Sequence, residues 1–161
     1  MEIRTAGPGD ISRLIELCAA HAGYEKCDYA ATGKGQRLAE LLCHEPTFEV
    51  LVVETQQQLV GYAAYVKQVS TWQAAHYLYL DCLFICEEFR GRGFGTKLMQ
   101  KIAARAKALG CHQIQWQTPC ENFRAIKFYD SLKGTTRQKK FRYAGPTKLL
   151  AFESEQQPIR S

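Results

Sequence analysis

The chain has 161 residues, of which 46% are hydrophobic, 23% charged and 11% aromatic. This composition suits one globular domain and excludes disordered, collagen-like and fibrous proteins. Lys and Arg outnumber Asp and Glu by 21 to 16, and the net charge of +5 would suit either a nucleic acid or a phosphorylated small molecule as partner. Because no apolar run approaches the roughly 20 residues that span a bilayer, and no targeting segment is recognised, we expect a cytoplasmic protein with no membrane partner.

The first half of the chain predicts a strand, two helices and three antiparallel strands. Ile11, Leu14, Ile15 and Cys18 recur on one helical face, and the second helix ends before Pro46. A loop rich in Gly, Asp, Tyr and Thr joins the two helices, and a polar turn joins the first two strands of the meander. The expected elements lie at 3–5, 11–18, 38–42, 48–54, 59–66 and 77–85, and the two connections at 23–35 and 55–58.

The second half predicts a crossover followed by a further helix and two strands. A Gly-rich segment at 93–95 precedes a helix that ends at Gly110, and the strand at 113–118 returns parallel to 77–85. Asn122 can cap the next helix. The inward positions expected on these two helices are Leu98, Met99, Ile102, Ala103, Ala106 and Leu109, and then Ala125, Phe128, Tyr129 and Leu132.

Two last strands, at 137–143 and 147–152, complete the predicted sheet. The whole is an α+β fold with a mixed, mostly antiparallel sheet of six to seven strands flanked by about four helices. We expect one domain at 1–153 and a polar tail at 154–161.

The seven cysteines and four histidines do not form a recognisable metal or redox motif. No two cysteines are separated by two residues, so neither a zinc site nor a CxxC pair is indicated, and no metal is expected. Cys18 fits the apolar face of the first helix, and we interpret the cysteines as reduced, largely structural thiols. His21 and the other histidines have no spacing that singles out a catalytic partner.

The segment from Phe89 to Thr96 carries the clearest chemical signal. Glycines let backbone amides approach a ligand closely, and the first turn of a helix adds N–H groups and a positive dipole end. The segment therefore predicts a cradle for a diphosphate. The spacing Gly91-x-Gly93-x-Gly95 does not match the nicotinamide dinucleotide fingerprint, and the Lys-Ser/Thr of a nucleoside-triphosphate loop is missing.

These residues resemble the Arg/Gln-x-x-Gly-x-Gly/Ala signature of the GNAT superfamily of acetyl-CoA-dependent N-acetyltransferases. The flanking segments at 79–85 and 121–129 also resemble that family at matching distances, and the likeness covers nearly the whole chain. Within the superfamily the motifs are most similar to spermidine/spermine acetyltransferases and to histone-and-polyamine acetyltransferases. Asp81 stands where the polyamine enzymes usually carry Glu, and Cys82 and Leu132-Lys133-Gly134 also depart from their pattern, so the acceptor does not follow from the likeness.

The resemblance implies acetyl-CoA as co-substrate and a GNAT fold, with a homodimer as a common assembly. It places the diphosphate on the amides of the cradle, which we define as residues 90–96, and the pantetheine along the end of the preceding strand. Asn122 would add a hydrogen bond to the cofactor, whereas Phe94 is interpreted as a packing residue. The implied cofactor-binding residues are Leu83, Phe84, Ile85, Arg90, Gly91, Arg92, Gly93, Phe94, Gly95, Thr96 and Asn122.

Two side chains are candidate catalytic groups. An alkylamine has a pKa near 10.4, so a proton must leave before the nitrogen attacks a thioester. Asp81 could accept that proton if the strand carries a bulge that turns it toward the substrate, as the resemblance implies, or it could simply bind backbone amides. Tyr129 could protonate the leaving thiolate, as the resemblance implies, or it could be a core aromatic.

The function predicted is acetyl transfer from acetyl-CoA to a primary amine by direct attack. The acceptor could be a polyamine, another small amine, an aminoglycoside or a lysine side chain. The alternative is a non-catalytic acyl-CoA-binding or sensing domain of the same family, which the joint presence of Asp81, Asn122 and Tyr129 disfavours. A nucleic-acid-binding module is a third possibility, disfavoured by the scarcity of exposed aromatics, and no nucleic-acid partner is expected.

Overall fold

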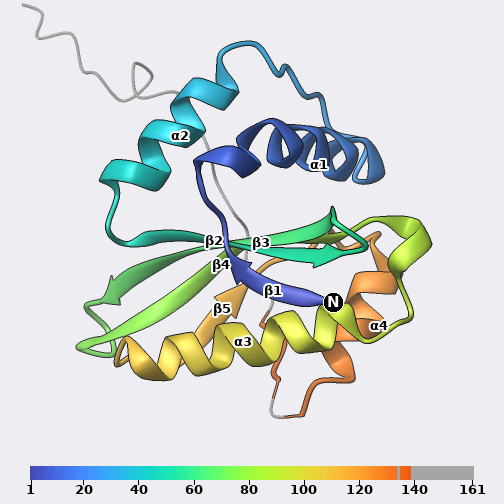
Figure 1. The fold of residues 1–161 in the computed structure, drawn as a ribbon. Coiled ribbons are helices and arrows are strands. Elements are labelled where there is room, and N and C mark those ends of the chain that lie inside the picture. The colour runs from blue at the N-terminus through green and yellow to red at the C-terminus, as the bar shows by residue number, and fades with distance from the viewer. Residues whose placement is uncertain (134, 139–161) are drawn as a thin grey trace, which may run out of the picture. The chain divides into compact units, whose positions relative to one another are not determined.

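The computed structural model describes residues 1–133 and 135–138. The chain divides into two compact units, Met1–Phe123 and Arg124–Ser161, which are described separately. The first unit holds the sheet and three of the helices in Figure 1. The second unit holds most of helix α4, which spans Phe123–Asp130.

A five-stranded sheet in the order β1-β2-β3-β4-β5 forms the centre of the first unit. The first four strands are antiparallel neighbours, and β5 pairs parallel to β4. The strands are β1 Glu2–Thr5, β2 Phe48–Thr55, β3 Gln58–Ser70, β4 Ala75–Ile85 and β5 Ile114–Trp116. The expected strands 137–143 and 147–152 fall mostly outside the described residues, and 137 and 138 themselves are not in a strand.

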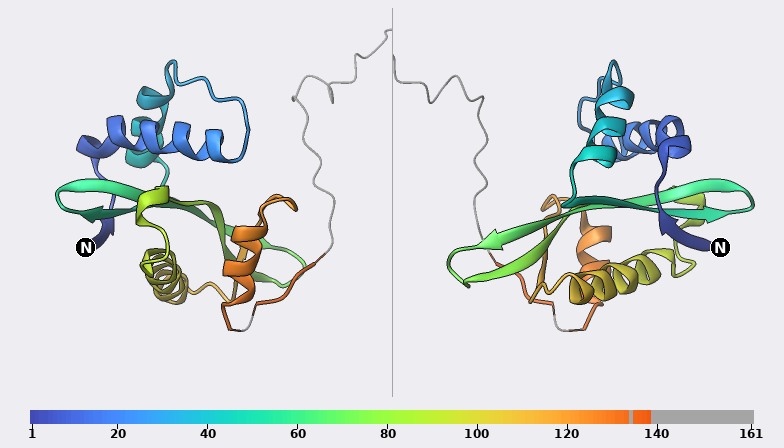
Figure 2. Two further views of the ribbon diagram at one scale, coloured as in Figure 1. Left: turned by 90° about the vertical axis from the view of Figure 1, so that its right-hand side faces the viewer. Right: turned by 60° about the vertical axis from the view of Figure 1, so that its left-hand side comes forward.

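Helices cover both faces of this sheet. Helices α1 (Ile11–Tyr24) and α2 (Lys34–His44) lie on one face, and α3 (Phe94–Ala108) lies on the other, as Figure 2 shows. On the α1 face the buried cluster joins the helix residues Leu14 and Leu17 to strand residues including Val52 and Tyr62. Because side chains alternate along a strand, the buried neighbours Leu51 and Val53 face α3 instead.

The structure confirms the α+β fold and refines the boundaries of several elements. Helix α1 continues past the expected 18 to Tyr24, so that Gly23 and Tyr24, which were expected in the loop at 23–35, belong to its last turn. The β2–β3 turn is tighter than expected: Gln56 and Gln57 alone form it, with φ angles of +52° and +60°. On α3, Ala103 was wrongly expected to face inward; it is exposed, because the buried stripe runs through Leu98, Met99, Ile102 and Ala106.

A β-bulge interrupts the pairing of β3 with β4. Ala64 pairs with Cys82 and Tyr65 pairs with Leu80, so Asp81 is left without a partner on β3. The extra residue reverses which face the strand presents. Leu80 therefore lies on the α3 face beside Tyr65, whereas Cys82 and Phe84 pack in the cluster on the α1 face.

Candidate active site at the open edge of strand β4

Strand β4 has one edge that is only partly paired. Its parallel ladder with β5 covers Leu78 to Leu80 and ends where Leu80 meets Trp116. Beyond that point, residues 82–85 pair with β3 alone among the described strands, and the bulged Asp81 has no partner on β3. We call residues 81–85 the open edge. An extended chain can add to such an edge through backbone hydrogen bonds. The expected pantetheine residues Leu83, Phe84 and Ile85 all lie here.

Asp81 lies at the start of the open edge, on the bulge that the sequence interpretation required. Its side chain is exposed, and the neighbouring Cys82 thiol contacts its Oδ2 at 3.6 Å. No hydrogen bond from a backbone amide to this carboxylate is seen among the described residues. The bulge thus presents the carboxylate to solvent beside the open edge.

The cradle connects the open edge to helix α3. Gly91 and Gly93 have φ angles of +76° and +79°, in the left-handed region that favours glycine. The first backbone bond of α3 runs from Lys97 N to Gly93 O at 3.1 Å, so the amides of Gly95 and Thr96 precede it in the first turn. Helix α3 begins at Phe94, and these two residues therefore belong to the helix rather than to the loop.

The geometry of the cradle fits a diphosphate. A Cβ atom built on Gly91 or Gly93 would meet no atom within 4 Å, so open space lies where a ligand would approach the backbone. Arg90 Nη1 is buried and has no hydrogen-bond partner in the described structure, which leaves one cationic donor unsatisfied. Arg92, by contrast, donates to Glu88 O at 3.0 Å and places its guanidinium 5.2 Å from the Phe89 ring.

Arg90 is tied to the end of β4 and to helix α1. Its Nε donates to Ile85 O at 2.8 Å. The guanidinium carbon lies 4.2 Å from the centroid of the Tyr24 ring and 5.5 Å from that of Phe84. The Tyr24 hydroxyl in turn donates to Asn122 Oδ1 at 3.3 Å. The first unit therefore brings together Asp81, the open edge, the cradle and Asn122.

Tyr129, the candidate proton donor, belongs to the second unit. It lies near the end of α4, with its ring centroid 5.1 Å from that of Phe128. Its carbonyl accepts hydrogen bonds from Leu132 N at 3.0 Å and from Thr135 Oγ1 at 3.1 Å. Its catalytic role stays a prediction.

A polar group that the sequence interpretation set aside lies beneath the open edge. His21 stacks on Phe84 with centroids 5.0 Å apart, and its Nδ1 lies 3.1 Å from the Tyr62 hydroxyl. Burial holds the pKa of His21 below its ordinary value of 6.5, although the nearby Glu25 carboxylate opposes that shift. Extending the apolar stripe of α1 by three residues beyond Cys18 would have identified His21 as half-buried.

The cysteines beside the site are protonated thiols at neutral pH. Burial, followed by the charge of Asp81, raises the pKa of Cys82 to about 12. Burial also raises the pKa of Cys18 and that of Cys86. A thiolate rather than a thiol is the nucleophile, so these residues are poorly suited to covalent catalysis.

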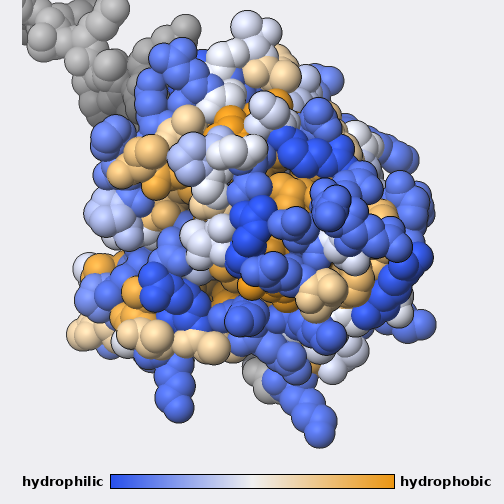
Figure 3. All heavy atoms as spheres, in the orientation of Figure 1, coloured by the Kyte–Doolittle hydropathy of each residue, from blue (hydrophilic) through white to orange (hydrophobic). Residues whose placement is uncertain are grey.

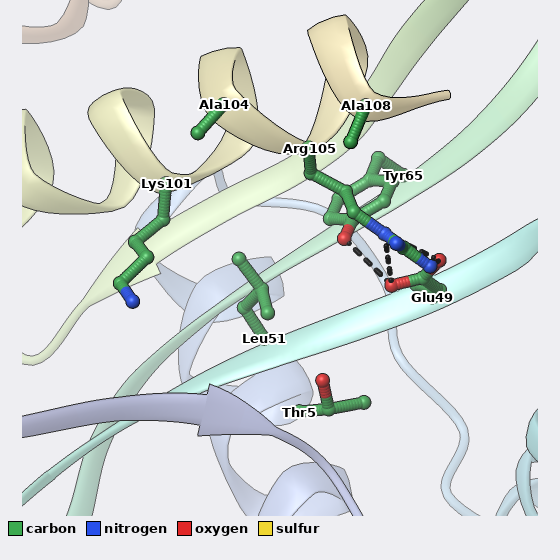
Figure 4. Close-up of a pocket in the computed structure, with 8 residues that line it drawn as sticks. All are labelled: Thr5, Glu49, Leu51, Tyr65, Lys101, Ala104, Arg105 and Ala108. Carbon is green, nitrogen blue, oxygen red and sulfur yellow. Dashed lines mark hydrogen bonds and ion pairs between the residues drawn. The ribbon is translucent and has the colours of Figure 1, made fainter.

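A separate hollow of about 430 Å³ lies on the α3 face, away from the cradle. In Figure 4 Arg105 reaches from α3 to the Glu49 carboxylate, which also accepts a hydrogen bond of 2.9 Å from Tyr65. Figure 3 shows apolar surface emerging between hydrophilic residues on the face of the molecule that contains β1 and α3. The hollow is lined by Thr5, Glu49, Leu51, Tyr65, Lys101, Ala104, Arg105 and Ala108.

Two general features of the described residues bear on function. No described helix has the length and apolar character that a bilayer crossing requires. The same part of the chain contains no group of three or more His, Cys, Asp or Glu side chains placed to hold a metal ion.

The fold and the site together define the class of protein. The sequence profile of the acetyltransferase (GNAT) family matches residues 14–134. The chain therefore belongs to this family, and the prediction of an N-acetyltransferase enzyme is confirmed at that level.

Named relatives support the same assignment. The chain is 30% identical over 139 residues to a thialysine N-epsilon-acetyltransferase of Bos taurus, covering 81% of each protein. It is 31% identical over 70 residues to a D-amino-acid N-acetyltransferase of Saccharomyces cerevisiae, covering 44% of each. Among solved structures, an aminoglycoside acetyltransferase from an uncultured soil metagenomic sample superposes with a TM-score of 0.78 at 18% identity, over 90% of this chain and 95% of that one, which supports the fold.

Proposed function

We propose that this protein transfers the acetyl group of acetyl-CoA to the primary amine of a small molecule, with an amino acid as the first acceptor class to test. The relatives named above include enzymes for thialysine and D-amino acids, and a shorter match of 27% identity over 74 residues, covering 46% of this chain and 32% of the relative, is an L-ornithine N5-acetyltransferase of Arabidopsis thaliana. Polyamines, aminoglycosides and protein lysines present the same nucleophile and remain comparison substrates.

The observation that carries the proposal is the bulge at Asp81. It leaves a carboxylate exposed on the open edge, which has no second partner strand among the described residues and leads into the cradle. In the proposed reaction Asp81, directly or through water, accepts the proton that the amine loses. The nitrogen then attacks the thioester carbonyl, and one N–H of the open edge polarises the carbonyl oxygen.

Acetyl-CoA, when bound, supplies the acetyl group as a thioester. The amides of the cradle would hold its diphosphate, Leu83 to Ile85 would pair with its pantetheine, and Asn122 would add a hydrogen bond. The C–S bond breaks as the new C–N bond forms, and Tyr129 delivers a proton to the departing sulfur. The second proton that the nitrogen loses on becoming an amide passes to the Tyr129 phenolate, directly or through water, which restores the hydroxyl. No residue of the chain is acylated in this scheme.

An amine panel tests the proposed function. Purified protein is incubated with acetyl-CoA and matched pairs of acceptors, such as lysine with cadaverine and ornithine with putrescine, which differ only in the carboxylate. Release of free thiol reports turnover, and mass spectrometry locates the acetyl group on the product. If CoA binds but no amine in the panel is acetylated above the water control, the catalytic proposal fails in favour of a binding or sensing role.

Asp81→Asn is the matched variant for the base. It keeps the size of the side chain and removes the carboxylate, so kcat at neutral pH should fall by about a hundredfold. The affinity for CoA should be unchanged, because the bulge backbone is kept. If Asp81 is the base, the difference in kcat between the variant and wild type should disappear at high pH, where the amine is already neutral. Wild-type kcat in this variant would remove Asp81 from the reaction.

A further inference from the structure

Tyr24 joins three parts of the candidate site that lie far apart in the sequence. It is the last residue of α1, and its side chain touches Arg90 at the start of the cradle and Asn122 before α4. It is also 41% exposed, which is unusual for an aromatic residue with two such contacts. We propose that Tyr24 is a positioning residue for the cofactor cradle, acting on the cradle through its ring and on Asn122 through its hydroxyl.

The ring takes the place of a missing hydrogen-bond partner for Arg90. The guanidinium bonds Ile85 O through Nε, but its Nη1 is buried without a partner among the described residues. The face of Tyr24, 4.2 Å away, is the nearer of the two rings that flank the guanidinium. A cation over an aromatic face is stabilised by the ring quadrupole, more strongly where water is excluded.

This contact fixes the direction in which the cradle leaves β4. Arg90 N donates to Glu87 O at 3.1 Å, and its side chain bonds Ile85 O, so Arg90 is anchored at both ends. Gly91 and Gly93 follow, both with positive φ angles, and because glycine has no Cβ their backbone can adopt other conformations readily. Without the ring, the guanidinium can recover hydration only by moving outward, and the anchor before the two glycines would loosen.

The hydroxyl has a second and separable role. It donates to Asn122 Oδ1 at 3.3 Å, while Asn122 N donates to Pro119 O at 3.0 Å. The bond constrains the orientation of the Asn122 side chain, which contacts the cofactor in the proposed function. The inference therefore rests on the proposed function for its consequence, whereas the two contacts of Tyr24 stand on the structure alone.

The binding experiment separates ring from hydroxyl. CoA is titrated by calorimetry into wild type, Tyr24→Phe, Tyr24→Leu and the control Tyr29→Phe, whose ring contacts Lys34 instead of the cradle. Tyr24→Leu should raise the Kd for CoA about tenfold, and the ring-retaining Tyr24→Phe by no more than about threefold. Equal losses of CoA affinity in Tyr24→Phe and Tyr24→Leu would overturn the role of the ring.

A double-mutant cycle tests whether the ring acts through Arg90. Tyr24→Leu should raise the Kd for CoA about tenfold in the wild-type background and by less than about twofold in the Arg90→Gln background. An undiminished effect in the Arg90→Gln background would overturn the proposal. So would a hundredfold fall in kcat for Tyr24→Phe at unchanged Kd, because Tyr24 would then be a catalytic acid.

A measurement without ligand keeps this test independent of the proposed function. Hydrogen exchange of the amides of residues 90–96 should be faster in Tyr24→Leu than in wild type, and unchanged in Tyr24→Phe and Tyr29→Phe. Melting curves establish that each variant is folded. If wild type itself fails to bind CoA, the proposed function is wrong, but the exchange rates still show whether Tyr24 orders the cradle. Identical exchange in Tyr24→Leu and wild type would overturn the positioning role.

Discussion

Gly93 allows the ligand role of the cradle to be separated from backbone strain. Its φ is +79°, and Gly110 at the end of α3 has a φ of +69°, with open space around the Cβ position of both. Gly93→Ala and Gly110→Ala should therefore each cost about 1 kcal/mol of folding free energy. Only Gly93→Ala should weaken CoA binding, because its methyl group would occupy the ligand side. Equal CoA affinity in the two variants would contradict the cradle assignment.

Tyr129→Phe separates the two interpretations of Tyr129. The ring and its contact with Phe128 are kept, and only the hydroxyl is lost. If that hydroxyl protonates the leaving thiolate, kcat should fall about a hundredfold with little change in melting temperature or CoA affinity. Steady-state kinetics and a melting curve on the same preparation make the comparison. Wild-type turnover would return Tyr129 to a packing role.

His21 makes the stability of the protein depend on pH. Its pKa in the folded state lies below 6.5, so the unfolded chain takes up the proton first as the pH falls. Above about pH 6.5 both states are neutral and His21 has no effect on stability; below it, the free energy of unfolding should fall until the pH passes the folded pKa. Urea unfolding measured at neutral and at mildly acidic pH should show that acidification lowers the free energy of unfolding less in His21→Gln than in wild type. His44→Gln, at an exposed histidine, is the control. An equal loss of unfolding free energy in wild type and His21→Gln would contradict the role of His21.

Gly61 shows how closely strand β3 approaches the open edge of β4. A Cβ at this position would lie 2.4 Å from Ile85 Cδ1 and 2.6 Å from Phe84 O, and the second atom is backbone. Gly61→Ala should therefore displace β4 and lower stability by about 1–3 kcal/mol. The matched change Gly35→Ala meets only Ile11 Cγ2 at 3.6 Å and Ile15 Cγ1 at 3.9 Å, both ordinary contacts, and should stabilise α2 by about 0.5–1 kcal/mol. Thermal unfolding of the two variants should shift in opposite directions, and an unchanged melting temperature in Gly61→Ala would contradict the close approach.

The sequence was informative where local patterns determine structure. The apolar stripes of α1 and α3 and the alternation of the meander predicted those elements, and the glycine spacing predicted the cradle. The sequence could not locate the end of the β4–β5 ladder or the pairing partner of Gly61, because both depend on register between distant segments. The bulge entered as an expectation from family resemblance, since Leu80-Asp81-Cys82 alternates like an ordinary half-buried strand. Contacts across long sequence separations, such as Tyr24 with Arg90, leave no local signal.

In the first unit, the packing of helices on both sides of the sheet follows from the two apolar faces of β2 and β3. The buried runs Val50–Val53 and Leu59–Tyr65 are nearly continuous, which requires cover on both sides. Which helices lie on which face depends on chain connectivity rather than on composition. The homodimer, the cytoplasmic location and the absence of nucleic-acid partners stay predictions, and light scattering of the purified protein would decide the first.

The open edge of β4 has a further consequence for how the protein behaves in solution. Unpaired backbone N–H and C=O groups along a strand edge can pair with a strand of another chain, and this pairing is one route to aggregation. Apart from Asp81 at its start, the open edge carries no charged side chain that would discourage such pairing. A ligand that hydrogen-bonds to this edge would block such pairing. The concentration of CoA should therefore affect the rate of aggregation as well as turnover. Turbidity during storage at equal temperature, with and without CoA, would reveal that protection independently of any catalytic measurement.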